Sequence, residues 1–270
     1  MLCSASLQTL TVSTQDHTTR LLYMRHRYAV PVLAMLLIAL VVGLGVAIAV
    51  GHNPMATVDN SVLHWTVGHR SPAATTVMSG VTNLFGPAWA LTWTLLATVA
   101  LILRDDTVMR GLTVLSTVAV AGALGTVFKA ACHRIRPPLV DQASGYEVGK
   151  SFPSGHVTGT AALVCALALA LTVASPAIWR TVAAVLALAI SIFAAATRLY
   201  LGVHWFSDVV AAIVLAGAIA LVMPAVVREL CVALSPHASP RFKPYIDPSI
   251  DANHLRRLQP ESDHHASVAP

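Results

Sequence analysis

The sequence predicts an all-α, polytopic membrane protein, a bundle of six transmembrane helices, from three observations. Of the 270 residues, 56% are hydrophobic. Only 11% are charged, whereas a soluble domain has about 25%. Six apolar runs also reach roughly the 20 residues that a helix needs to cross a bilayer. A soluble chain this apolar would expose hydrophobic patches too large for a monomer.

The first expected span covers 29–50 and follows a polar segment, 1–28, that we expect to be a cytoplasmic tail. Basic residues stand directly before the apolar run in MRHRYAVPVLAMLL, so Met24 is an alternative start of the protein. A signal peptide cleaved after AIA at 47–49 is the competing interpretation. The run is longer than the apolar core of a signal peptide, which favours an uncleaved anchor.

The second and third expected spans cover 84–103 and 111–132. The outer loop before them, 51–83, has amphipathic character around 62–67, which is typical of a helix lying in the membrane interface. Gly122, Gly125 and Thr126 are small residues of the third span, and such residues let membrane helices approach one another closely.

The last three expected spans cover 156–174, 181–201 and 207–227, which gives a membrane domain over 29–228. The polar, Pro-rich segment 229–270 cannot bury enough apolar surface to fold alone, so we expect a disordered cytoplasmic tail. Its histidines at 254, 264 and 265 favour a solvated tail over a weak metal site. The four cysteines, at 3, 132, 165 and 231, have neither disulfide nor metal-site spacing.

The net charge of +5 raises the possibility of nucleic-acid binding, but its distribution argues against it. With a cytoplasmic N-terminus, most Lys and Arg residues lie on the inner side, as the positive-inside rule requires. The sequence therefore predicts a multi-pass protein of the cell membrane with both termini in the cytoplasm.

Three polar clusters interrupt the apolar pattern. KAACHRIRP closes the third span at 129–137, SFPSGH opens the fourth at 151–156, and TRLYLGVHWFSD connects the last two at 197–208. Because consecutive spans alternate in direction, these helix ends all face the same side of the membrane. The clusters are therefore expected to meet at the outer membrane surface.

The clusters contain the parts of a phosphate site. Lys129, Arg136 and Arg198 place three cations at membrane depth, which is costly unless an anion joins them. Arginine's planar fork suits phosphate oxygens. Ser154 and Gly155 open a helix, whose free N–H groups bind anions, and glycine lets an anion approach the backbone.

Two histidines and a carboxylate complete the cluster. Asp208 follows His204 by four residues, so it can hold the imidazole tautomer and leave the other nitrogen free to attack. His156 is then available as general acid. Other interpretations are interfacial histidines, cations that snorkel to headgroups, and a metal site formed by His133, His156, His204 and Asp208. Three neighbouring cations disfavour the metal site.

In order, the clusters read K-x6-R-P, P-S-G-H and R-x5-H-x3-D, and so the chain resembles the phosphatidic acid phosphatase type 2 superfamily. This superfamily includes membrane lipid phosphatases, glucose-6-phosphatase and soluble vanadium haloperoxidases. Its third motif usually begins with Ser-Arg. Here Thr197 replaces that serine and keeps the hydroxyl.

The resemblance implies a role for each residue. The phosphate-binding residues would be Lys129, Arg136, Ser154, Gly155 and Arg198. His204 would attack phosphorus to form a phosphohistidine, Asp208 would orient it, His156 would protonate the leaving group, and water would release phosphate. The resemblance implies no metal or other cofactor and a site facing the periplasm or extracellular side.

The depth of the site predicts a membrane lipid substrate, a lipid phosphate or pyrophosphate. Polyprenyl pyrophosphate, phosphatidic acid and phosphatidylglycerol phosphate all fit, with specificity expected from 51–83, from 138–150 and from the gaps between helices. A lipid phosphotransferase with the same site and a non-catalytic, transporter-like protein are the alternatives. A haloperoxidase is disfavoured because those enzymes are soluble. The oligomeric state stays open.

Overall fold

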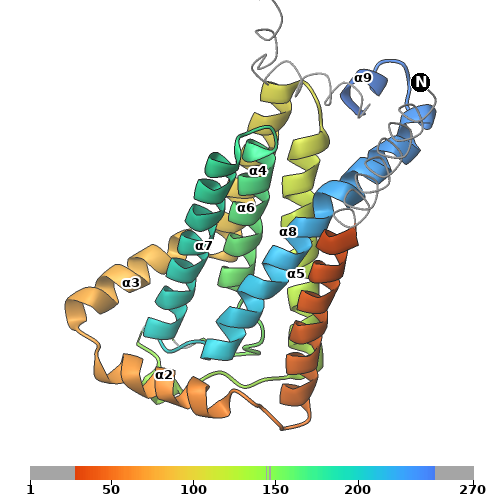
Figure 1. Cartoon of the computed structure of the whole chain (residues 1–270). Helices are drawn as coiled ribbons and strands as arrows, with labels where there is room; N and C mark the ends of the chain where they lie inside the picture. The colour runs from red at the N-terminus through yellow and green to blue at the C-terminus, as the bar shows by residue number, and fades with distance from the viewer. Residues whose placement is uncertain (1–27, 144, 146, 247–270) are drawn as a thin grey trace, which may run out of the picture.

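The computed structural model describes residues 28–143, 145 and 147–246 (Figure 1). Within these ranges, six helices are long and apolar enough to cross a membrane, which confirms the predicted all-α membrane bundle. They are Tyr28–Ala49 (red in Figure 1), α4 (Pro87–Asp105), α5 (Met109–Cys132), α6 (Gly155–Thr172), α7 (Ala177–Tyr200) and α8 (Phe206–Leu234).

The six helices begin and end within a few residues of the predicted spans, except at the end of α8. This helix continues past Pro224 to Leu234 and is followed by η2 (Ser235–His237) and α9 (Lys243–Ile246). A helix needs apolar residues only where it contacts lipid, so the apolar run ends before the helix does. The domain limits at 28 and 228 stay predictions. Met24 and residues 247–270 lie outside the described residues.

Helix α6 lies at the centre of the bundle, where it contacts α4, α5, α7 and α8. Its buried residues are mostly small, among them Ala161, Ala162 and Ala166. Because small side chains let helix backbones approach closely, they suit a helix with four neighbours. The first residues of α6 are thereby held between the ends of α5 and α7 and the start of α8.

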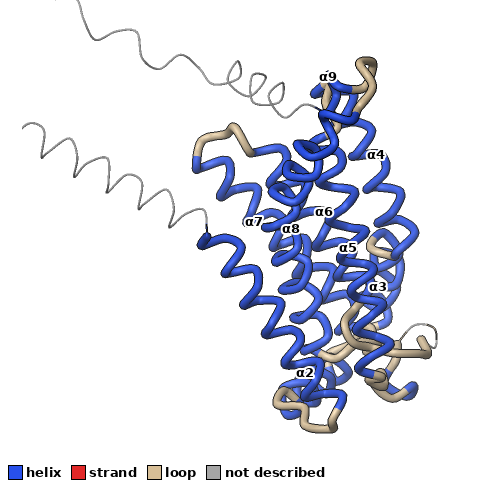
Figure 2. Tube along the Cα trace, turned by 90° about the vertical axis from the view of Figure 1, so that its right-hand side faces the viewer, coloured by secondary structure: helices blue, strands red, loops and turns tan. Residues whose placement is uncertain are grey.

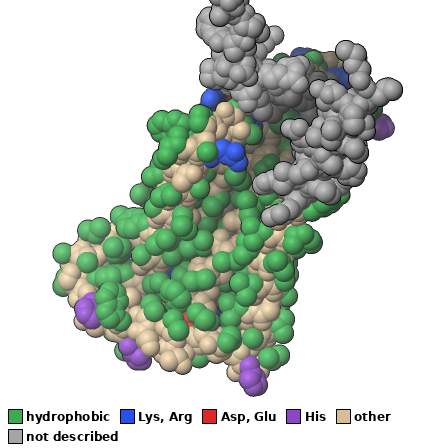
Figure 3. Space-filling view, in the orientation of Figure 1, with side chains coloured by type: hydrophobic (Ala, Val, Ile, Leu, Met, Phe, Trp, Pro, Cys, Tyr) green, Lys and Arg blue, Asp and Glu red, His purple; other side chains and the backbone are tan. Residues whose placement is uncertain are grey.

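The outer surface of the bundle is apolar. Many large hydrophobic side chains are exposed, such as Leu40, Leu96 and Leu103. Figure 3 shows hydrophobic side chains over the middle of one face, histidines at its lower end, and Lys and Arg at its upper end. This distribution matches a protein whose flanks contact lipid and whose two ends contact water.

Two short helices, α2 (Ala56–Gly68) and α3 (Pro72–Leu84), occupy the loop in which the sequence predicted an interfacial helix. α2 crosses the lower end of the bundle and α3 leads back toward α7 (Figures 1 and 2). Ser71 begins α3, because its side chain accepts a hydrogen bond from the N–H of Ala74 and Pro72 occupies the first turn. α2 contacts α7 and α8, so it covers the end at which the polar motifs lie.

Candidate active site

The three motifs meet around one cavity of about 500 Å³ at the end of the bundle covered by α2. Its lining includes three charged residues and two histidines: Lys129, Arg136, Glu147, His156 and His204. Gly155 lines it as well. His156 and His204, which are 48 positions apart in the sequence, therefore face the same space.

The three predicted cations come from different elements, and two of them, Lys129 and Arg136, line this cavity. Lys129 lies in the last turn of α5, and its Nζ donates a hydrogen bond of 3.2 Å to the carbonyl oxygen of Lys150. Arg136 lies between α5 and α6, and its Nη1 donates to the carbonyl oxygen of Val203 at 2.7 Å. Arg198, in the last turn of α7, is only 1% exposed.

Arg198 is fixed by a pair of threonines. Its Nη1 donates to Thr82 Oγ1 at 3.0 Å, and the Thr82 and Thr197 hydroxyls lie 3.1 Å apart. The Thr197 hydroxyl in turn donates to the carbonyl oxygen of Ala194 at 2.7 Å. The hydroxyl that Thr197 keeps in place of serine is thus part of the support of Arg198.

Glu147 joins this group, and the sequence did not single it out. Its carboxylate forms ion pairs with Arg198 and with Arg136, the latter at 3.0 Å. Burial favours the neutral acid, but the positive charges of Arg198 and Arg136 outweigh it and lower the pKa of Glu147. The two guanidiniums therefore converge on one anionic group.

Ser154 and Gly155 begin α6 beside these cations. Ser154 is fully buried, and its hydroxyl makes no hydrogen bond within the described part of the chain. A Cβ added to Gly155 would meet open space, so an approaching group meets no side chain there. An unpartnered hydroxyl beside a helix N-terminus is suited to bind an anion.

His204 is held between a carboxylate and a guanidinium. Its Nδ1 lies 3.4 Å from Asp208 Oδ2, and its Nε2 lies 3.0 Å from Arg136 Nη1. Both contacts fit one tautomer, in which Nδ1–H donates to Asp208 and the Nε2 lone pair accepts from Arg136 Nη1. Nε2 becomes free to attack when Arg136 Nη1 donates to a phosphate oxygen instead. Burial lowers the pKa of His204 to about 4, although Asp208 acts in the opposite direction. The imidazole is therefore neutral at physiological pH, as a nucleophile requires.

Asp208 also contacts Arg134, whose other side reaches Asp59 on α2. Neither Arg134 nor Asp59 was predicted as a site residue from the sequence. Arg134 lies inside the first motif, and Asp59 is the single acidic residue of 51–83, but no spacing rule connects them.

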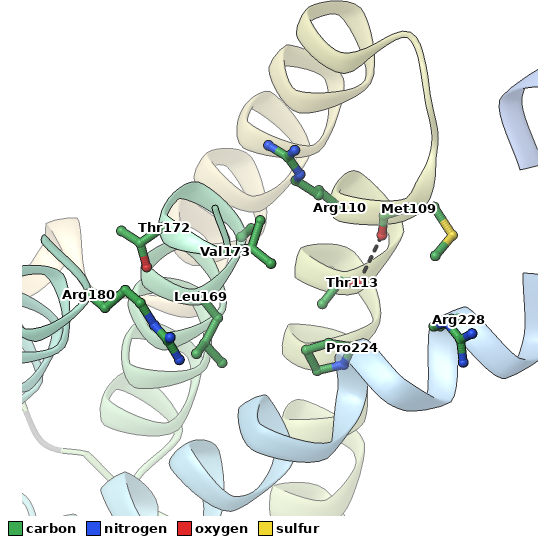
Figure 4. A pocket seen from close by; sticks show the side chains of 10 residues that line it. Met109, Arg110, Thr113, Leu169, Thr172, Val173, Arg180, Pro224 and Arg228 are labelled. Atoms are coloured by element: carbon green, nitrogen blue, oxygen red, sulfur yellow. Dashed lines mark hydrogen bonds between the residues drawn. The ribbon is translucent and has the colours of Figure 1, made fainter. Parts of the chain in front are cut away.

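No three His, Cys, Asp or Glu side chains among the described residues are arranged to hold a metal ion, so His133 does not complete the alternative set. A second cavity, of about 380 Å³, lies at the opposite end of the bundle and is lined by Arg110, Arg180 and Arg228 among mainly apolar residues (Figure 4). Its lining includes neither histidine nor carboxylate.

Comparison with known proteins agrees with this arrangement. Residues 110–230 match the model of the PAP2 superfamily, which confirms the resemblance seen in the motifs. The chain is 28% identical over 168 residues to phosphatidylglycerophosphatase B of Bacillus subtilis (strain 168), a match that covers 60% of this chain and 80% of that protein.

A solved structure has the same fold. It is the crystal structure of a transmembrane PAP2 type phosphatidylglycerolphosphate phosphatase from Bacillus subtilis, with a TM-score of 0.64 and 24% sequence identity. The similarity covers 73% of this chain and 96% of that one. α5 to α8, with all three motifs, thus fall within the matched family region or its immediate edges.

Proposed function

We propose that this membrane protein, whose residues 110–230 carry the PAP2 superfamily match, is a phosphatase that hydrolyses a lipid phosphate or pyrophosphate through a phosphohistidine. One observation carries the proposal: a single cavity is lined by Lys129, Arg136, Glu147, His156 and His204 together with mainly apolar residues of α4 and α5. This lining matches a lipid phosphate, which combines a charged headgroup with apolar hydrocarbon chains.

The first chemical step uses the predicted residues. Lys129, Arg136 and Arg198 hold the phosphate oxygens, with help from the Ser154 hydroxyl and the Gly155 N–H. His204 Nε2 attacks phosphorus, and the bond from phosphorus to the leaving oxygen breaks. His156 gives its proton to that oxygen, while Asp208 stabilises the positive charge on His204.

The second step releases phosphate. A water molecule attacks phosphorus, and His156, now neutral, takes its proton. The N–P bond breaks and its electron pair returns to His204 Nε2. Inorganic phosphate leaves and both histidines are restored, so the cycle balances with water as the acceptor and requires neither metal nor other cofactor.

The apolar part of the cavity supports a lipid substrate. Ala90 and Leu91 of α4 and Val118 and Gly122 of α5 line it. Val118 precedes Lys129 by eleven residues, about 16 Å along a helix. That length accommodates hydrocarbon beside a phosphate held at the cation end. Phosphatidylglycerol phosphate, phosphatidic acid and polyprenyl pyrophosphate are the candidates.

The charge distribution supports the proposed orientation in a cell membrane. Arg104, Arg110, Arg180 and Arg228 lie at the end of the bundle away from the site. The positive-inside rule places that end in the cytoplasm, together with both termini. The active site then faces the periplasm or the extracellular side.

Phosphate release by the purified protein, in detergent with EDTA, tests the proposal. We expect release from at least one of the three lipids, abolished in His204→Ala and reduced by about 10²–10⁴-fold in His156→Ala. His64→Ala, an exposed histidine of α2, is the matched control. Full activity in His204→Ala would refute the phosphohistidine, and inactivity caused by EDTA would refute metal independence. A phosphorylated acceptor in place of inorganic phosphate would identify a phosphotransferase.

A further inference from the structure

Arg134 connects two buried carboxylates. Its Nη1 donates hydrogen bonds of 2.5 Å to Asp208 Oδ1 and 2.7 Å to Ser207 Oγ. Its Nη2 donates to Asp59 Oδ2 at 2.6 Å. The guanidinium also lies 5.5 Å from the ring centre of Trp205, within the range of a cation–π interaction. With its side chain 9% exposed, Arg134 is fixed on every side by polar or aromatic groups.

Asp59 is the far end of this chain of contacts. It is 2% exposed, although it belongs to the short helix α2. Its Oδ1 accepts from the backbone N–H of Ser207 at 2.8 Å, and its Oδ2 accepts from the Ser207 hydroxyl at 2.8 Å and from Asn53 Nδ2 at 2.9 Å. Asp59 therefore reaches the first turn of α8, directly beside Asp208.

The carboxylate of Asp208 is shared between two partners. Its Oδ2 faces His204 Nδ1 at 3.4 Å and accepts from the backbone N–H of Trp205 at 3.0 Å, while Oδ1 faces Arg134. Arg134 alone would neutralise the charge that His204 needs when it becomes cationic. Asp59 supplies a second negative charge, so the three groups together keep one net negative charge beside the imidazole.

We propose that Asp59 and Arg134 are positioning residues for the attack of His204, acting through the orientation and charge of Asp208. This inference rests on the proposed phosphatase function. A merely structural alternative is that the same bonds only fasten α2 to α8. The two roles predict different results. Loss of either charge would weaken the attachment of α2 to α8 in the same direction, whereas it would shift the pKa of His204 in opposite directions.

The other charged groups that face His204 come from α5, α6, α7 and the connection between α5 and α6. They are Lys129, Arg136, Glu147, His156 and Arg198. None of them changes in the variants below, so a difference between variants reports the charges of Asp59 and Arg134.

The test is the pH profile of kcat/KM, whose acid limb reports ionisation in the free enzyme. Because burial lowers the pKa of His204 to about 4, the wild-type limb is expected far below the ordinary value of 6.5. Asp59→Asn removes a negative charge and should shift the midpoint of the acid limb to lower pH by about half a unit. Arg134→Gln removes a positive charge and should shift the midpoint to higher pH by a similar amount. The double variant Asp59→Asn/Arg134→Gln should return it close to the wild-type position.

The expected kinetic signature is a fall in kcat of about 10-fold in each single variant, with KM changed less than about 2-fold. Asp106→Asn and Arg104→Gln remove the same charges from the opposite end of the bundle and should leave the limb unmoved. If Asp59→Asn fails to fold, the shift of the limb in Arg134→Gln relative to the wild type still tests the role.

An unmoved limb in the folded variants, with only lower activity or thermal stability, would overturn the positioning role and leave a fastening role. A wild-type protein that releases no phosphate from any of the three lipids would refute the proposed function itself, and the positioning role with it.

Discussion

Glu147 is the counter-charge of two buried cations in the candidate site, Arg136 and Arg198. A guanidinium taken out of water costs several kcal/mol unless a nearby anion compensates. Arg198 is almost fully buried and Arg136 largely so, and both pair with the Glu147 carboxylate. A substrate phosphate that binds these guanidiniums therefore competes with the carboxylate.

Glu147→Gln is expected to strengthen phosphate binding. The amide keeps the size of the side chain but loses its charge, so inorganic phosphate no longer competes with an anion. The inhibition constant of phosphate should fall by about 10-fold, in the range of a charge-assisted interaction. Steady-state inhibition measured at pH 7 tests this, with Asp141→Asn in the same connection as control. An unchanged or weaker inhibition by phosphate would contradict the competition.

At the level of residues, sequence reasoning found the groups that stand in motifs and missed those that depend on the path of the chain. Arg136, His156 and His204 have fixed spacing from helix ends, so alternation of the helices was enough to bring them together. Glu147 lies in an irregular connection between Gly145 and Gly149, both with positive φ. The position of a side chain in such a segment depends on tertiary packing. It cannot be predicted from a helical or strand period, because the segment has none.

The turn between α7 and α8 sets the position of half of the site. It runs from Arg198 in the last turn of α7 to Asp208 in the first turn of α8. Gly202 occupies it with φ of 68°, and a Cβ there would collide with the carbonyl oxygen of Asp141 and with Arg70 Nη2. The close approach of the Asp141 segment thus requires glycine.

Gly202→Ala is therefore expected to destabilise the protein and to disturb the site together. Left-handed backbone strain alone costs about 1–3 kcal/mol, and the collision adds to it. Gly217→Ala is the matched control, because a Cβ at that helical position meets nothing within 4 Å. Thermal unfolding in detergent and kcat measure the two effects. Equal stability of the two variants would contradict the requirement for glycine.

Among the elements, the six long helices were predictable because each is an apolar run of spanning length. α2 and α3 were anticipated only as one interfacial helix, since their existence depends on contacts with α7 and α8 rather than on their own apolar pattern. Asp59 is an example. Its burial could not be predicted from the sequence of α2, because it depends on the contacts with Arg134 and Ser207.

The molecule as a whole combines a lipid-facing flank with a polar end. The cavity joins the two, because its lining changes from Lys129 and His204 to Ala90, Leu91 and Val118. Sequence reasoning predicted the polar end and its membrane depth. It could not predict the apolar slot, which is formed between α4, α5 and α6 by the absence of side chains at Gly122 and Gly125.

Filling this slot should separate lipid substrates from soluble ones. Gly122→Leu places a side chain in space that is open within 4 Å, and it should lower kcat/KM for a long-chain lipid phosphate by about 10-fold or more. A small soluble phosphomonoester should be hydrolysed as by the wild type. Gly43→Leu, on the exposed side of Tyr28–Ala49, is the control. An equal loss for both kinds of substrate would mean that the slot does not hold the hydrocarbon.

The ion pairs of Glu147 have a further consequence for a protein surrounded by phospholipids. Most bilayer headgroups present a phosphodiester with a single negative charge, which offers Arg136 and Arg198 no more than one carboxylate already gives. A terminal phosphomonoester carries about −1.5 to −2 at neutral pH. Under the proposed function, the Glu147 carboxylate therefore favours the doubly charged monoester, which can replace it, over the more abundant diesters, which carry no more charge than the carboxylate itself.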